Sequence, residues 1–221
     1  MFILALDAAL ARCSVALVED GVARACRSAQ GGRGQQSVLA PMLQEVLRAL
    51  PPGGRLDAVA VTVGPGSFTG LRSALALAHG LAAGQCEVVG VTVAEALAAA
   101  IQHSPQPLGH RVLWTAIDSR RGRVFLDIGG CVRPYQLDAL PTPDGPVAIA
   151  GDAANAVAAS LAGRGFDVRL THARLPDAIW VAEVGAIRHA GGLPTLEAMP
   201  LYIDPPEAKL PVGGLRPHPV S

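Results

Sequence analysis

A glycine-rich segment, Gly64-Pro65-Gly66-Ser67-Phe68-Thr69-Gly70, is the part of this sequence whose residue types could bind an anion. An apolar run, residues 58–63, precedes it, and a run of small and apolar residues, 71–83, follows it. This order predicts a buried strand, a loop, and a helix whose first amides could meet a phosphate group. The candidate phosphate contacts in this segment are Gly64, Gly66, Ser67, Thr69, Gly70 and Arg72.

The same segment is also compatible with a simpler structure. It does not fit the Walker pattern, because Gly66 and Gly70 are one residue too close together. A tight strand-to-helix turn, capped by Ser67 or Thr69, remains the alternative. A serine nucleophile is excluded, because Pro65 and Thr69 stand where the G-x-S-x-G elbow requires glycine.

Two aspartates, Asp7 and Asp118, end apolar runs that are separated by half of the chain. A short turn and a second apolar run follow each of them, at residues 13–19 and 123–128. A carboxylate at the mouth of such a hairpin can face phosphate groups and Mg²⁺. The alternative is that each aspartate only forms a turn.

No residue set in the sequence predicts a metal or a nucleophile. No two of the six histidines are four residues apart, so a helical His-x-x-x-His pair is absent from the sequence. The four cysteines are scattered without a Cys-x-x-Cys pair, and we expect free thiols. We therefore expect no metal and no catalysis by this chain alone.

The composition is that of a folded domain with no general affinity for polyanions. Of 221 residues, 50% are hydrophobic and 16% are charged, and 18 basic residues balance 18 acidic residues. This excludes a disordered chain and gives no overall electrostatic reason to bind nucleic acid. The longest uncharged runs have roughly 14 residues, fewer than the roughly 20 of a membrane helix, so we expect a cytoplasmic protein.

Periodicity predicts an α/β fold of two duplicated lobes. In the first half we expect strands at residues 2–7, 13–19, 22–29, 58–63 and 88–91, and helices at 38–50, 71–83 and 93–102, with Ser37 as a helix cap. The second half repeats this start, with strands at 111–118, 123–128 and 146–150 and a helix at 153–161. We predict domains at residues 1–108 and 109–221, the latter ending in an extended proline-rich tail; a single mixed sheet is the alternative.

The helices predicted at 38–50 and 71–83 carry more apolar surface than one sheet can cover. We therefore predict that they bind a second protein, unless the C-terminal segment covers them. The predicted interface residues are Val38, Leu39, Met42, Val46, Leu71, Ala74, Leu75, Ala78, His79 and Ala82.

Four segments in this order resemble the TsaB (YeaZ) family. They are residues 3–17, the GPGSFTGLR segment at 64–72, Asp118-x-Arg120-x-Gly122-x-Val124, and a tail from Pro200-Leu201-Tyr202 to Lys209-Leu210-Pro211. The resemblance implies an actin-like (ASKHA, ribonuclease H-like) fold of two lobes, each a mixed sheet flanked by helices. It also implies a role in forming N6-threonylcarbamoyladenosine (t6A) at position 37 of tRNA.

In that family the protein is a non-catalytic accessory subunit. The resemblance implies that it binds and activates the catalytic paralogue TsaD, that the ATPase TsaE joins them, that tRNA is reached through the complex, and that the isolated chain forms a homodimer. ATP or ADP would bind weakly or through the complex. The alternative is an independent ATP-dependent phosphotransferase or ATPase that uses Asp7 and Asp118.

Overall fold

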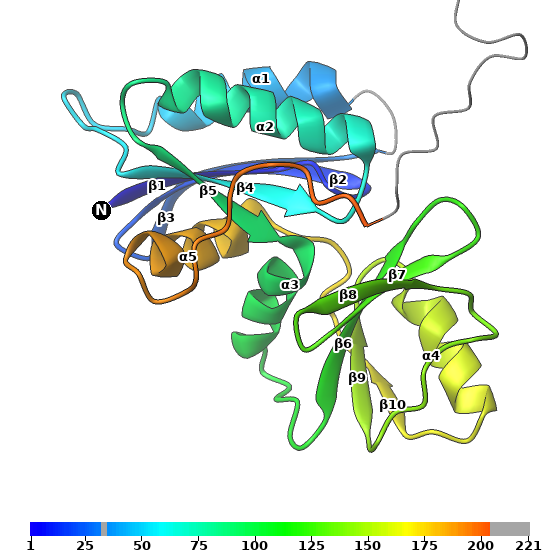
Figure 1. Cartoon of the computed structure of the whole chain (residues 1–221). Coiled ribbons are helices and arrows are strands. Elements are labelled where there is room, and N and C mark those ends of the chain that lie inside the picture. The colour runs from blue at the N-terminus through cyan, green and yellow to red at the C-terminus, as the bar shows by residue number, and fades with distance from the viewer. Residues whose placement is uncertain (32–34, 204–221) are drawn as a thin grey trace, which may run out of the picture.

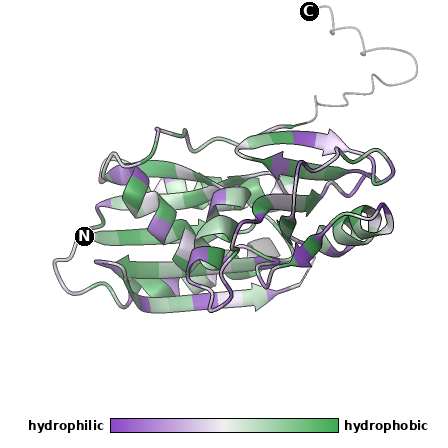
Figure 2. Cartoon of the chain, turned by 90° about the horizontal axis from the view of Figure 1, so that it is seen from below, coloured by the Kyte–Doolittle hydropathy of each residue, from purple (hydrophilic) through white to green (hydrophobic). Residues whose placement is uncertain are grey.

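The computed structural model describes residues 1–31 and 35–203, and the predicted extended tail lies outside these residues. Two five-stranded sheets form the framework (Figure 1). Most strand segments are hydrophobic in Figure 2, as expected of sheets that pack against helices. Within the described residues, no helix is long and apolar enough to cross a membrane.

The first sheet is built around β1, the apolar run that ends in Asp7. Its strand order is β3-β2-β1-β4-β5, with β1 antiparallel to β2 and parallel to β4. The predicted order of elements, βββαβαβα, is confirmed in this half. The elements are β1 (Phe2–Asp7), β2 (Arg12–Glu19), β3 (Val22–Gln30), α1 (Gln35–Leu47), β4 (Ala58–Gly64), α2 (Phe68–Ala82), β5 (Glu87–Thr92) and α3 (Val93–Gln102).

The second sheet repeats this topology. Its order is β10-β9-β6-β7-β8, with β6 antiparallel to β7 and parallel to β9. This confirms the two-lobe α/β duplication and excludes a single mixed sheet. The elements are β6 (Val112–Asp118), β7 (Val124–Ile128), β8 (Cys131–Tyr135), β9 (Val147–Ala150), α4 (Ala154–Gly163) and β10 (Val168–Leu170).

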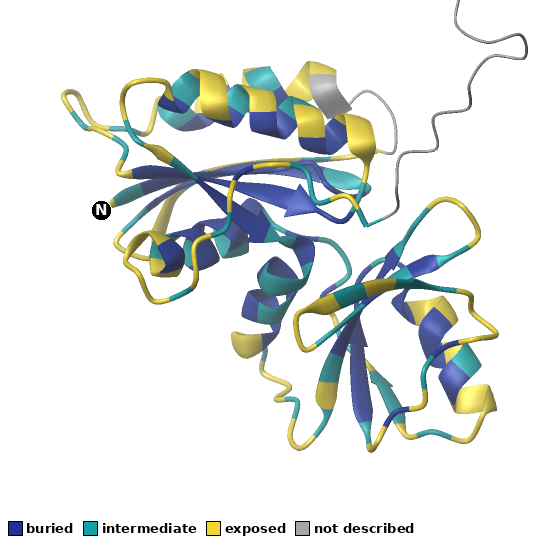
Figure 3. Cartoon of the chain, viewed as in Figure 1, coloured by how far each residue is buried: buried dark blue, intermediate teal, exposed yellow. Residues whose placement is uncertain are grey.

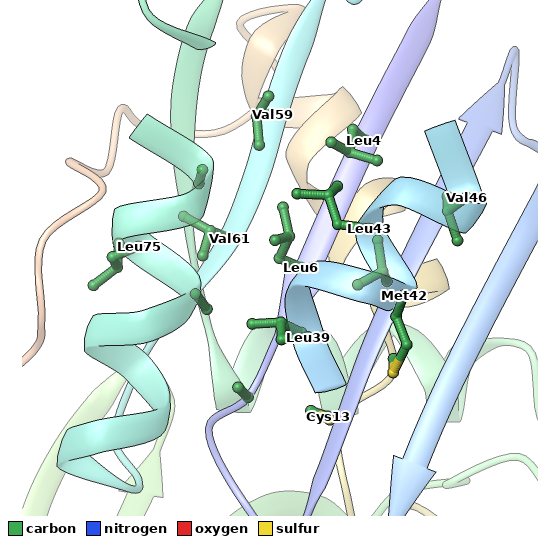
Figure 4. Packing of buried hydrophobic residues seen from close by; sticks show 14 of the residues in the cluster. Leu4, Leu6, Cys13, Leu39, Met42, Leu43, Val46, Val59, Val61 and Leu75 are labelled. Carbon is green, nitrogen blue, oxygen red and sulfur yellow. The ribbon is translucent and has the colours of Figure 1, made fainter. Parts of the chain in front are cut away.

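Helices cover both faces of the first sheet. On one face, α1 and α2 pack Leu39, Leu43 and Leu75 against strand residues such as Leu6 and Val61 (Figure 4). On the other face lies α5 (Ala178–His189), a helix that the sequence analysis did not predict. The first lobe is thus completed by a segment from far along the chain.

The connection between the lobes runs through α3 (Figure 1). Leu97 and Ile101 of α3 share one hydrophobic cluster with Ile117 and Ala150 of the second sheet. The predicted domain limit at residues 108 and 109 falls just after α3 and stays a prediction. Because α5 packs on the first sheet, residues 178–189 lie with the first lobe rather than with the second sheet.

The beginnings of two helices differ from the prediction. Helix α1 begins at Gln35, so Ser37 lies inside its first turn and is not the cap. Helix α2 begins at Phe68, three residues earlier than expected, because Ser67 is its N-cap. The side-chain oxygen of Ser67 accepts a hydrogen bond from the Gly70 amide at 3.2 Å.

Candidate functional site

The glycine-rich loop between β4 and α2 packs tightly against the turn that follows β1. The Ser67 amide donates to the carbonyl oxygen of Ala9 at 2.6 Å. A Cβ atom on Gly66 would lie 2.2 Å from that oxygen, and one on Gly70 would lie 2.0 Å from the oxygen of Ala8. These two glycines therefore allow two segments of this chain to approach each other, and the Ser67 cap is the one named in the alternative, a tight strand-to-helix turn.

Arg72 stands at the outer rim of this loop. Its guanidinium lies 3.8 Å from the centre of the Phe68 ring and donates to the Tyr202 hydroxyl at 3.1 Å. Both aromatic side chains are exposed. Together they hold the cation at the surface, as expected of a cation–π contact. Thr69 is also exposed.

Asp7 is completely buried at the end of β1. Its Oδ1 atom accepts hydrogen bonds from the Ala9 amide at 3.1 Å and from the Thr62 hydroxyl at 2.8 Å. Its Oδ2 atom is buried without a partner among the described residues. Burial raises the pKa of this carboxyl to about 7, and the two hydrogen bonds oppose that rise.

Asp118 is half-exposed at the end of β6, the position that corresponds to Asp7 in the repeat. Its Oδ1 atom accepts from the Arg120 amide at 2.8 Å, and its own amide donates to Oδ1 of Asp152 at 2.9 Å. The Arg120 side chain lies 3.7 Å from Asp118 and 3.4 Å from Asp152. Asp152 was not singled out from the sequence, although Gly151-Asp152 follows a predicted strand. Burial raises its pKa.

The junction after β9 repeats the junction after β4. Gly151 has φ +98°, and a Cβ atom there would lie 2.1 Å from the Ala116 oxygen. The Ala153 amide donates to the same oxygen at 3.1 Å. In both lobes, a glycine thus lets the segment before a helix pack closely on backbone, at the turn after β1 in the first lobe and at β6 in the second.

Part of the residue set predicted to contact a phosphate is packed inside this chain. Asp7 is shielded from solvent. Gly66 and Gly70 pack directly against backbone atoms of this chain. Asp118 is the one accessible carboxylate of the predicted pair. Phosphate contact by these residues stays a prediction. Within the described residues, no three His, Cys, Asp or Glu side chains are grouped to hold a metal ion.

The structure corrects which residues of α1 and α2 face outward. Eight of the ten predicted interface residues are buried in this chain, because they form the faces that pack on the first sheet. They are Leu39, Met42, Val46, Leu71, Ala74, Leu75, Ala78 and Ala82. Val38 and His79 are exposed, and His79 Nε2 lies 2.9 Å from the Ala198 oxygen. A partner that binds these helices would have to contact their other faces.

The outer faces of α1 and α2 are exposed side by side (Figure 3). On α2 the exposed positions include the small residues Ala76 and Gly80, with His79 between them and Phe68 and Arg72 at the N-terminal end. On α1 they include Pro41 and Glu45, the latter paired with Arg27 at 2.8 Å. We call these outward positions of α1 and α2 the outer helical face.

Comparisons with known proteins agree with the resemblance seen in the sequence. Residues 30–128 match the family described as TsaD, tRNA N6-adenosine threonylcarbamoyltransferase. The Escherichia coli K12 protein named tRNA threonylcarbamoyladenosine biosynthesis protein TsaB is 36% identical over 127 residues. That alignment spans 57% of this chain and 53% of the relative, so it covers about half the length of that curated protein.

Two solved structures from Pseudomonas aeruginosa match over nearly their whole length. One, described as an uncharacterized protein with similarity to peptidase YEAZ, has a TM-score of 0.73 and 25% identity, covering 92% of this chain and 99% of the other. The other, YeaZ, has a TM-score of 0.70 and 26% identity, covering 91% and 99%. The duplicated lobes fit the actin-like fold class, and the chain is similar in sequence and fold to proteins of the TsaB (YeaZ) family.

Proposed function

We propose that this chain is a non-catalytic accessory subunit in the formation of t6A on tRNA. The proposal rests on one observation, the likeness to YeaZ that extends over more than nine-tenths of the chain. The Escherichia coli relative carries t6A biosynthesis in its name. In this role the chain binds and activates a TsaD-like catalytic paralogue, with a TsaE-like ATPase and tRNA joining through the complex.

The outer helical face is the surface that we assign to the TsaD-like partner and, in the isolated chain, to a second copy. Two of its exposed positions on α2, Ala76 and Gly80, are small and lie about one turn apart, so another helix can approach closely there. Most of the large apolar residues of α1 and α2 are already packed against the first sheet, and Val38 and Phe68 are the exposed exceptions. Binding therefore depends mainly on shape complementarity at small residues rather than on the burial of a large apolar surface.

We propose that any ATP or ADP binds weakly or through the complex. The complete burial of Asp7 and the packed glycine loop support this, because they leave the isolated chain without two of the predicted contact groups. Catalytic turnover by the chain alone would contradict the proposal. Hydrolysis of ATP by the purified chain, measured with and without the paralogue, tests it directly.

The interface is tested with Ala76→Arg, which places a long cation on the outer helical face without entering the core. We expect the dissociation constant for the TsaD-like paralogue to rise about 30-fold, equivalent to about 2 kcal/mol at an interface centre. The matched control is Ala162→Arg, which makes the same change at an exposed position of α4. Calorimetry on the co-purified partners gives the constants.

Both variants should keep the unfolding temperature of the parent chain. In a reconstituted reaction, tRNA nucleosides are measured by mass spectrometry, and Ala76→Arg should lower t6A formation while Ala162→Arg does not. Equal affinities for the two variants would remove the outer helical face from the proposal. Full t6A formation without this chain would remove the accessory function itself.

A further inference from the structure

A cavity of about 460 Å³ lies between α3, the second sheet and the segment that follows α5. Figure 1 shows these three parts meeting where the β7–β8 turn approaches α3. Neither the glycine-rich loop nor the aspartates at positions 7 and 118 line it. Its size is that of small-molecule sites in proteins. The proposed accessory function does not use this cavity.

One wall of the cavity is apolar and built from small side chains. Ala94 and Ala98 project from successive turns of α3, and Leu113 of β6 and Leu196 lie among the other lining residues. Ala94 and Ala98 are partly exposed although α3 is covered on its other side. The apolar part of a ligand could replace water against this wall.

Arg188 is the cationic residue that lines the cavity, and all three nitrogen atoms of its guanidinium donate hydrogen bonds to groups of this chain. Its guanidinium bonds to Glu95 at 2.5 Å, to the Gly90 oxygen at 2.7 Å and to the Pro194 oxygen at 2.7 Å. Glu95 also accepts from the Thr92 amide, which closes the capping box of α3. The Glu95–Arg188 pair is therefore internally neutral and rigid.

Asp127 is the carboxylate that this pair does not neutralise. It lines the cavity from β7, and its Oδ1 atom accepts from the Gly130 amide at 2.9 Å. No ion pair among the described residues includes it. Burial raises its pKa, and the nearby Glu95 charge acts in the same direction. A carboxylate with one structural hydrogen bond, partial burial and no counter-ion can be stabilised by a cation.

We propose that this cavity binds a small organic cation, an amine or guanidinium joined to an apolar group. The cation would pair with Asp127, and the apolar group would lie along Ala94 and Ala98. Phosphorylated ligands such as ATP fit this chemistry poorly, because their negative charge would meet the unpaired carboxylate of Asp127. The inference therefore concerns a second site, separate from any nucleotide contact.

The test uses the full chain and three probes of similar shape: phenethylamine, the neutral 2-phenylethanol and the anionic 3-phenylpropionate. We expect the amine to shift the amide NMR signals of Gly129 and Gly130. Its affinity should exceed that of either other probe about tenfold, the size of a partly buried charge pair. ATP serves as a further probe and should not shift these signals.

Two variants assign the effect to the cavity. Asp127→Asn keeps an oxygen acceptor for the Gly130 amide but removes the charge, so amine binding should weaken about tenfold and alcohol binding should not change. Ala98→Leu fills the apolar wall and should weaken both. Asp138→Asn removes the same charge from an exposed position of the second lobe and should change neither.

The result that overturns the proposal is an amine that binds Asp127→Asn and the parent chain equally. Absence of amine binding at millimolar concentration overturns it as well, as does preferential binding of ATP or 3-phenylpropionate. The unfolding temperatures of the three variants show that each remains folded.

Discussion

Compared with the parent chain, the variant Asp7→Asn should gain stability as the pH rises. In the folded chain the pKa of Asp7 is about 7, against 3.8 as the ordinary value. Its contribution to the free energy of unfolding is complete below about pH 4. It declines as the pH rises towards 7, because the folded chain then holds a proton that the unfolded chain has released.

The size of the effect follows from the shift of the pKa. A shift of about 3 units corresponds to about 4 kcal/mol of stability lost between pH 4 and pH 8. Asp7→Asn keeps an oxygen that can accept from Ala9 and Thr62 and has no charge to bury. The difference in unfolding free energy, variant minus parent, should therefore rise by about that amount over this interval.

Urea unfolding at closely spaced pH values measures this difference, with Asp138→Asn as the control for a changed net charge. A difference that does not vary with pH would show that Asp7 titrates normally in the folded chain. A difference that falls with rising pH would show that its charged form is stabilised, for example by Arg12. Either result would refute the assignment of Asp7 as a buried, poorly compensated carboxyl.

Two further predictions concern the loop before α2. Gly66→Ala should cost about 2–4 kcal/mol of unfolding free energy, because the new Cβ would lie 2.2 Å from the Ala9 oxygen. Gly163→Ala is its control: no atom lies within 4 Å of the new Cβ, and stability should stay the same or rise by up to about 1 kcal/mol. Equal effects in urea unfolding would contradict the close packing. Ser67→Ala should cost about 1 kcal/mol in the same assay, because it removes the cap of α2, and an unchanged stability would show that the 3.2 Å bond to Gly70 contributes nothing.

The first half of the fold could be predicted from the sequence because its local signals agree. Helix α3 has the predicted bounds, and its capping box, Thr92 with Glu95, explains the sharp beginning. The glycine-rich loop was correctly placed between a strand and a helix. Its inward packing could not be predicted, because the atoms that it meets belong to the β1–β2 turn, far away in sequence.

The elements that were missed have weak local signals. Strand β8 contains Pro134, which argues against a strand, but β8 lies at the edge of its sheet where proline is tolerated. Strand β10 has three residues and depends on pairing with β9. For α5 a signal was present: Asp177 caps it and Arg188 and His189 lie in its last turn.

The error about the partner surface has a specific cause. Helix α2 carries apolar residue types on all sides, which predicted that its whole surface must be buried. Its large side chains, such as Leu71 and Leu75, face the sheet, whereas Ala76 and Gly80 face outward. Alanine and glycine bring little apolar area, so their exposure costs little.

The return of α5 to the first sheet has a consequence for synthesis on the ribosome. The face that α5 covers, including Ile3, Ala5 and Ala60, consists of residues made early, and Gly185 must come close to Ala60. Translation has to proceed beyond residue 189 before that face is sealed. Between the synthesis of β5, which ends at Thr92, and that of α5, the nascent chain therefore carries an open apolar sheet surface, the kind of surface that chaperones bind.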